Sequence, residues 1–170
     1  MSTNQFGPTN LDATLIPKIA EQWGTPIYLH DQAYIENSCE QLLGMPNAFS
    51  LHVRYAMKAN SDRTVLRVVT SKGLDLDCSS LDEAARAHAA GVPFSRMMLT
   101  TQEVPMGEER AELEAMIKAG LKYNVCSMLQ FNLIADFAKA NNVNLSMRVH
   151  PGAAGGGESA TRDTGSEYSC

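Results

Sequence analysis

The chain has 170 residues, of which 44% are hydrophobic and 19% are charged, and its formal net charge is −5. This composition is typical of a soluble globular chain of one-domain size. The acidic balance argues against nucleic acid or an anionic membrane as the main partner, since both attract clustered Lys and Arg. No apolar run approaches the roughly 20 residues of a bilayer span. The first eight residues lack the basic and apolar regions of a secretory signal, so we expect a cytoplasmic protein.

Cysteine usage fits a reducing compartment. Cys39, Cys78, Cys126 and Cys170 are far apart, with no Cys-x-x-Cys pair and no His at metal-ligand spacing, so we expect no metal site. Cys78 and Cys126 fall at the ends of predicted strands, where a free thiol is most often a small buried apolar group rather than a reactive one.

Hydrophobic periodicity predicts helices and short strands that alternate along the chain. The first part contains a helix over 12–23 that ends at Gly24, a short strand over 27–29, and a helix from the cap Asp31 to Leu43. Five strands follow, at 51–57, 74–78, 97–100, 122–125 and 144–149. The helices between them are predicted over 64–71, 81–90, 107–119 and 128–140, with Gly91 and Gly120 as stop residues after two of them.

Helices of this length between short strands favour parallel pairing with right-handed crossovers, hence a doubly wound sheet or a (β/α)8 barrel. No Gly-x-Gly-x-x-Gly follows the first strand, which favours the barrel. Polar residues also follow the strands, and in a barrel they meet at the C-terminal mouth, where barrel enzymes place their chemistry. They are Lys58, Asn60, Asp77, Cys78, Ser79, Thr100, Thr101, Gln102, Arg148 and His150. The alternative, that such residues only form turns, is the favoured interpretation for Asn60, Ser79 and Thr101.

Lys58 is the most informative of these residues. It ends the strand over 51–57, and strand alternation would place it on the face of Arg54 and Ala56, while Tyr55 and Met57 face the helices. A lysine on an inward face is usually paired or reactive, because burying an unpaired ammonium is costly. From spacing alone, an exposed lysine just past an edge strand is an equally good interpretation.

The segment from Tyr55 to Asn60, Tyr-Ala-Met-Lys-Ala-Asn, resembles the Tyr-Ala-x-Lys-Ala-Asn signature of fold-type III pyridoxal-phosphate decarboxylases, the alanine racemase-like barrel group. Four further segments, at 25–31, 73–83, 147–152 and 164–169, resemble motifs of the decarboxylase branch in the same order, closest to diaminopimelate decarboxylase. Alanine racemase is disfavoured, because Ser-Asp-Arg-Thr at 61–64 replaces the continuation of its motif.

The resemblance implies a partial (β/α)8 TIM barrel, with N-terminal helices and an initial strand over 1–50 and an incomplete cofactor-binding barrel over 51–170. It implies that Lys58 forms the internal aldimine with pyridoxal 5'-phosphate and that Asp77 and Arg148 line the cofactor pocket. Ser80, Glu83 and His150 become possible pocket residues. For Ser80 and Glu83 the alternative is a helix cap and a carboxylate at a helix start.

The reaction implied is decarboxylation of meso-diaminopimelate to L-lysine in a full-length homodimer, without nucleic acid or membrane partners. Ornithine, arginine and carboxynorspermidine are alternative substrates, and a truncated, catalytically silent chain is the non-enzyme alternative. Two departures leave substrate choice open: the loop over 153–160 has no His, and His150 stands where the family usually has Asn. The glycines of that loop, at 155–157, lack the Lys-Ser or Lys-Thr of a P-loop, and we interpret them as a flexible loop.

The chain ends after five of the eight barrel strands expected of the family, and the C-terminal β-domain of the family would be absent. Five parallel strands cannot close, so we expect unpaired strand edges and an apolar interior facing water. A product of this length by itself is expected to be marginally stable or aggregated, and inactive.

Overall fold

The computed structural model describes residues 11–149. Its helices are α1 (Leu15–Trp23), α2 (Gln32–Leu43), α3 (Arg63–Ser71), α4 (Leu81–Ala89), α5 (Glu108–Lys118) and α6 (Met128–Ala140). Its strands are β1 (Arg54–Ala56), β2 (Asp75–Cys78), β3 (Met97–Leu99), β4 (Lys122–Val125) and β5 (Ser146–Met147). Two 3-10 turns, η1 (Met57–Ala59) and η2 (Phe94–Arg96), adjoin β1 and β3. Among these elements no helix is long and apolar enough to cross a bilayer.

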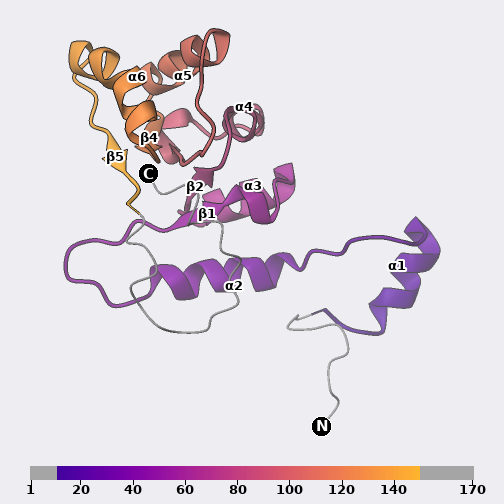
Figure 1. The fold of residues 1–170 in the computed structure, drawn as a ribbon. Coiled ribbons are helices and arrows are strands. Elements are labelled where there is room, and N and C mark those ends of the chain that lie inside the picture. The colour runs from indigo at the N-terminus through magenta and orange to yellow at the C-terminus, as the bar shows by residue number, and fades with distance from the viewer. Residues whose placement is uncertain (1–10, 150–170) are drawn as a thin grey trace, which may run out of the picture.

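The five strands form one parallel sheet in the order β1-β2-β3-β4-β5, and each strand pairs with the next one along the chain (Figure 1). A doubly wound sheet reverses its strand order at a switch point, whereas a barrel keeps it sequential. The order therefore confirms the predicted partial barrel. Within residues 11–149 the sheet does not close, because β1 and β5 each pair on one side only.

The two faces of the sheet differ in burial. Residues that point to the helices are buried, and Leu76, Leu99 and Val125 are all 0% exposed. Helices α3 and α4 contact β2, α4 also contacts β3, and α6 contacts β4. The opposite face carries side chains that are only half-buried, among them Asp77 and Asn124. This face lines the inside of the incomplete barrel, so its polar residues correct the expectation of an apolar interior exposed to water.

The predicted strand at 27–29 does not form. These residues run without regular structure before α2, and Tyr28 is 95% exposed. An isolated extended segment with no neighbouring strand gains no ladder hydrogen bonds, so a β-like pattern of residues does not become a strand. The strands predicted at 51–57 and 144–149 are also shorter than expected, because β1 turns into η1 at Met57 and β5 contains only Ser146 and Met147.

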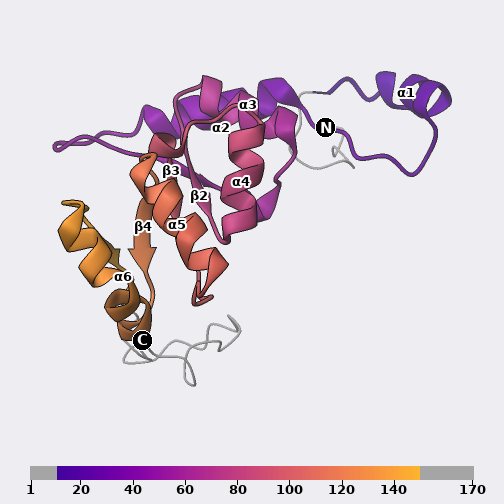
Figure 2. The same ribbon diagram turned by 90° about the horizontal axis from the view of Figure 1, so that it is seen from above.

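The N-terminal helices attach unequally to the barrel. Helix α1 lies away from the sheet in both views and has no buried residue (Figures 1 and 2). Helix α2 begins as predicted at the cap Asp31, whose side chain accepts a hydrogen bond from the Tyr34 amide at 3.0 Å. It packs against α3, where Lys72 forms ion pairs with Glu36 and Glu40 at 3.0 and 2.8 Å.

Glycines at the helix ends shape the loops that precede β3 and β4. Gly91 and Gly120 follow α4 and α5 as predicted, with φ of 99° and 107°. A Cβ at Gly120 would also lie 3.1 Å from Ser95, so both its conformation and its surroundings favour glycine.

Arg96 fastens the N-terminal side of the sheet. Its guanidinium donates to the carboxylate of Asp75 at 3.1 Å and to the backbone oxygens of Thr70 and Leu74 at 3.1 and 2.7 Å. Three acceptors from α3, β2 and the loop between them are thus joined to the start of β3. The guanidinium serves the three acceptors from three different nitrogens in a fixed plane, a geometry that the single ammonium group of a lysine cannot reproduce.

Replacing this arginine should therefore destabilise the fold. We expect Arg96→Met to lower the free energy of unfolding, measured in urea, by about 1–2 kcal/mol, because three hydrogen bonds are lost. The loss is limited to this size because the side chain is partly exposed and its former partners can bind water instead. Arg110→Met is the matched control: Arg110 pairs with Glu114 within α5 at 2.9 Å, and its loss should cost less than about 0.5 kcal/mol. Equal losses of unfolding free energy in the two variants would refute the proposed stabilising role of the Arg96 hydrogen bonds.

Candidate active site at the carboxyl ends of the strands

Lys58 lies in the turn η1, immediately beyond the carboxyl end of β1. Met57 turns into the helix layer and is fully buried, whereas the side chain of Lys58 is exposed. Of the two interpretations of Lys58, the structure agrees with the exposed lysine just past an edge strand, because the extended strand ends at Ala56 and Lys58 follows in the turn η1. The burial of Met57 and the partial burial of Tyr55 against the core agree with the predicted outward face.

The turn that carries Lys58 is fixed on both sides. The Tyr55 hydroxyl donates to the backbone oxygen of Asn60 at 3.1 Å, and burial raises the pKa of that phenol. The Asn60 side-chain oxygen accepts from the Asp62 amide at 2.9 Å, and its nitrogen lies 3.4 Å from Nε2 of His30. Asn60 is thus a turn-forming residue, in agreement with the prediction, and it holds the backbone next to Lys58.

The helix that follows β2 begins with a side-chain cap. The Ser80 oxygen accepts from the Glu83 amide at 3.2 Å, and the Glu83 carboxylate accepts from the Ser79 amide at 2.7 Å. This reciprocal arrangement resembles a capping box. The capping alternative for Ser80 and Glu83 is confirmed, and their contact with a cofactor stays a prediction.

A similar arrangement after β4 contains a residue that the sequence analysis missed. The Ser127 oxygen accepts from the Gln130 amide at 3.1 Å, and Gln130 in turn accepts from the Cys126 amide. Gln130 is 2% exposed and also donates to the backbone oxygens of Thr101 and Glu103. The spacing Ser-x-x-Gln before an apolar run is the signal that could have identified it.

Asp77 stands at the centre of the polar inner face. It pairs in register with Ala56, two residues before Lys58, so it neighbours the end of β1. The Thr100 hydroxyl donates to its Oδ1 at 2.9 Å. Its other oxygen, Oδ2, has no hydrogen-bond partner within residues 11–149, and is thus left for a ligand or solvent. The register therefore brings Asp77 to the Lys58 end of the sheet, as the barrel mouth requires.

The remaining predicted residues lie beyond β5. The Arg148 amide donates to the Val125 oxygen at 2.8 Å, which continues the pairing of β4 and β5, and its side chain is exposed. Arg148 therefore lies, like Asp77, at the carboxyl ends of the strands. His150 lies outside the described residues, as do the segments at 153–160 and 164–169.

The available groups fit one end of a pyridoxal molecule. An exposed primary amine can react with an aldehyde, and the Lys58 side chain has no hydrogen-bond or ionic partner in the described part of the chain. Helix N-termini commonly bind the phosphate groups of ligands, but those of α3, α4 and α6 are already capped by side chains. Asp62 accepts from the first-turn amides of α3, which lowers the pKa of its carboxyl group, and side chains also cap α4 and α6.

Helix α5 does not offer a phosphate-binding N-terminus either. It begins at Gly107 without a side-chain cap, but Glu108 and Glu109 occupy its first turn and would repel a phosphate. Four helices follow strands in residues 11–149, and each has an N-terminus that is either capped by a side chain or flanked by negative charges that would repel a phosphate. The described residues thus fit the aldehyde end of the cofactor, and no N-terminus of these four helices is open to its phosphate.

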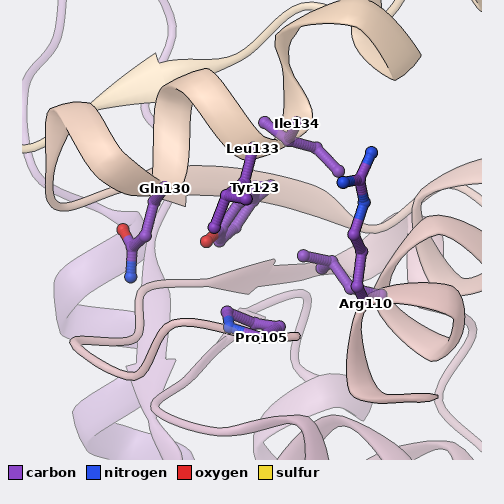
Figure 3. A pocket seen from close by; sticks show the side chains of 7 residues that line it. Pro105, Arg110, Tyr123, Gln130, Leu133 and Ile134 are labelled. Carbon is purple, nitrogen blue, oxygen red and sulfur yellow. The ribbon is translucent and has the colours of Figure 1, made fainter. Parts of the chain in front are cut away.

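Two cavities lie among the described residues, and they differ in size. One, between β4, α5 and α6, has a volume of about 10 Å³ and lies on the helix side of the sheet, next to Tyr123 and Gln130 (Figure 3). That is about the space of one water molecule. The other has a volume of about 250 Å³ and is lined by α2 and α3 and by His30 and Asp62 at their starts. The described residues also contain no group of His, Cys, Asp and Glu side chains that could hold a metal ion.

The fold and this site are those of a pyridoxal-binding barrel. Residues 34–169 match the family described as pyridoxal-dependent decarboxylase, pyridoxal binding domain. The chain therefore belongs to this family, whose cofactor is pyridoxal 5'-phosphate.

Named relatives agree with this assignment. The chain is 27% identical over 154 residues to the diaminopimelate decarboxylase of Archaeoglobus fulgidus, covering 89% of this chain and 35% of the relative. It is 30% identical over 138 residues to the enzyme of the same name from Neisseria meningitidis, covering 79% of this chain and 33% of the relative. The chain thus spans about a third of the length of these relatives.

Solved structures share the fold. Diaminopimelate decarboxylase from Helicobacter pylori, in complex with L-lysine, superimposes with a TM-score of 0.65 at 23% identity, covering 79% of this chain and 33% of that one. Lysine/ornithine decarboxylase from Vibrio vulnificus, in complex with putrescine, gives a TM-score of 0.65 at 22% identity, covering 80% and 36%. These neighbours support the partial barrel and do not discriminate between substrates.

The cysteine of the second-strand motif is chemically inert in this structure. Cys78 is fully buried, and its thiol lies 3.4 Å from the sulfur of Met57. Burial raises its pKa to about 12, and the charges of Glu83 and Asp77 act in the same direction. The thiol rather than the reactive thiolate is therefore the form present near neutral pH.

We expect iodoacetamide at pH 8 to leave Cys78 unmodified in the folded protein and to alkylate it in urea, with peptide mass spectrometry as the measurement. The urea sample is the control for reagent and peptide recovery. Alkylation of Cys78 in the native protein at the rate of an exposed peptide thiol would contradict its assignment as a core residue.

Proposed function

We propose that the protein containing this chain is a pyridoxal-phosphate-dependent carboxy-lyase that converts meso-diaminopimelate to L-lysine and CO2, with Lys58 as the residue that binds the cofactor aldehyde. One observation carries the proposal: Lys58 has an exposed amine, without a partner among residues 11–149, just beyond the first strand of a sequential parallel sheet. Asp77 on the next strand pairs in register with Ala56, two residues before Lys58. Membership of the decarboxylase family and the names of the relatives support the substrate.

The chemistry divides between the cofactor and the chain. Pyridoxal phosphate, when bound, supplies an aldehyde for amines and a ring that accepts the electron pair left behind when a carboxyl group departs as CO2. Lys58 Nζ acts as a nucleophile in its neutral form and can donate a proton in its charged form. Asp77 Oδ2 is an acceptor for a donor group of the cofactor or substrate. Arg148, on the same side of the sheet, supplies a permanent positive charge that suits carboxylate or phosphate oxygens.

Two groups of residues complete the proposed pocket. Ser80 and Glu83 lie behind Asp77 at the start of α4, where their mutual hydrogen bonds fix the loop after β2. His150 follows Arg148 in sequence and is assigned to the pocket by the family motif alone. We also propose a division at residue 50, with N-terminal helices before it and the barrel after it, because α1 and α2 precede the strands of the sheet.

The setting of the enzyme is part of the same proposal. A reaction that yields lysine belongs to lysine biosynthesis, and the acidic composition and the buried thiols of Cys39 and Cys78 suit the cytoplasm. We propose that the protein acts there as a homodimer. Because the described sheet has two unpaired edges, we expect the 170-residue chain by itself to be inactive.

The role of Lys58 can be tested by covalent trapping. We expect borohydride treatment of the cofactor-loaded protein to fix pyridoxal phosphate on the peptide containing Lys58, and Lys58→Ala to lose both this label and more than about 99.9% of the decarboxylase activity. Lys122→Ala is the matched control: Lys122 is an exposed lysine at the opposite, N-terminal end of β4. A label that stays in Lys58→Ala would refute the assignment.

Substrate choice needs a separate measurement. We expect CO2 release from meso-diaminopimelate with a kcat/KM at least about 100-fold above that from ornithine, arginine or carboxynorspermidine. A site built to bind the second carboxylate of meso-diaminopimelate rejects amino acids that lack it and leave its partners unpaired. Cofactor binding at Lys58 with a preference for one of the other amino acids would keep the reaction type and overturn the proposed substrate.

A further inference from the structure

Four polar side chains cross the inner face of the sheet, one from the end of each of four neighbouring strands. Ser146 Oγ donates to Asn124 Oδ1 at 2.9 Å, and Asn124 Nδ2 donates to Thr100 Oγ1 at 3.4 Å. Thr100 Oγ1 in turn donates to Asp77 Oδ1 at 2.9 Å. We call this series the polar ladder. It runs from β5 to β2 and ends at the strand next to Lys58.

The donors of the polar ladder all point the same way. A carboxylate can only accept, so the hydroxyl hydrogen of Thr100 goes to Asp77, and the lone pairs of Thr100 accept from the amide of Asn124. The amide oxygen of Asn124 then accepts from Ser146. Hydrogen bonds arranged in series polarise one another, so each link strengthens the donor aimed at Asp77.

Strand pairing does not require these side chains. The backbone already joins β2 to β3 through the Thr100 amide and the Cys78 oxygen at 2.9 Å, and β4 pairs in register with both β3 and β5. The members of the ladder are half-buried or exposed, so water could satisfy each of them singly. What the ladder adds is a fixed direction for the carboxylate of Asp77.

The fixed direction has a consequence for the site. With Oδ1 held by Thr100, Oδ2 is the acceptor left on the inner face beside Ala56, two residues before Lys58. We propose that Thr100 and Asn124 are positioning residues that orient the Asp77 carboxylate for binding of pyridoxal phosphate at Lys58. The proposal rests on the proposed function, and it concerns residues whose side-chain hydrogen bonds within residues 11–149 go to Asp77 and to other members of the polar ladder.

The test compares variants of nearly equal shape in the protein expressed from its natural gene. Thr100→Val removes the hydroxyl but keeps the volume, whereas Thr100→Ser keeps the hydroxyl. We expect Thr100→Val to raise the Kd for pyridoxal phosphate about tenfold and Thr100→Ser to stay within about twofold of the wild type. The readout is the change in visible absorbance during titration of the apoprotein.

Two further variants separate direction from packing. Asn124→Asp replaces the amide donor by an acceptor, which draws the Thr100 hydroxyl away from Asp77, so it should weaken binding as much as Thr100→Val. Thr70→Val is the control: its hydroxyl bonds within α3 to the Leu66 oxygen at 2.7 Å, away from the sheet face, and its loss should leave the Kd unchanged. In an Asp77→Asn background, Thr100→Val should have no further effect on the Kd.

The outcomes are distinguishable. An unchanged Kd in Thr100→Val would overturn the positioning role. Equal weakening by Thr100→Val and Thr100→Ser, with a matching fall in the thermal unfolding midpoint of the apoprotein, would also overturn it and assign Thr100 to packing. If the wild type forms no complex with pyridoxal phosphate, the proposed function itself fails. Three results together support the proposal. The Kd of Thr100→Ser stays near that of the wild type, Thr100→Val has no further effect on the Kd in the Asp77→Asn background, and the thermal unfolding midpoints of the variants are unchanged.

Discussion

The structure depends on one constraint, the pairing of consecutive parallel strands in unbroken sequential order. Because side chains alternate across each strand, this pairing sends Leu76, Leu99 and Val125 to the helices and gathers Asp77, Thr100 and Asn124 on the other face. The apolar layer stabilises the sheet by burial against α3 to α6, and the polar face becomes available for chemistry. A shift of one residue in any strand would exchange the two faces and remove both the core and the site.

The loops that leave the strands divide their polar groups between two tasks. Asp62, Ser80 and Ser127 bond to backbone amides at the starts of α3, α4 and α6, so they fix where each helix begins and hence where each loop turns. Lys58 and one oxygen of Asp77 stay outside these networks. The structure therefore distinguishes residues that shape the mouth from residues that can act in it, although both kinds stand side by side in the sequence.

Much of this arrangement could be predicted from the sequence. The helices and strands after residue 50 follow hydrophobic periodicity and glycine stops, and the family motif at 55–60 indicates the cofactor. The pattern at 27–29 misled because strand formation needs a partner strand, which local sequence does not reveal. Strand alternation could not decide between the two interpretations of Lys58, because the strand ends at Ala56 and the lysine follows in a 3-10 turn. Asn124 and Ser146 carried no motif, since their contacts arise only when parallel register places Asn124 beside Thr100 and Ser146 beside Asn124. His150 lies outside the described residues.

The central claim is that an amine at the end of β1 holds the cofactor on the polar face of the sheet. The most direct measurement is an experimental structure of the protein crystallised with pyridoxal phosphate. The account predicts continuous density between Lys58 Nζ and the cofactor, with the ring on the inner face near Asp77 and the phosphate away from the capped starts of α3, α4 and α6. Density that joins the cofactor to another lysine, or a ring on the helix side of the sheet, would contradict it.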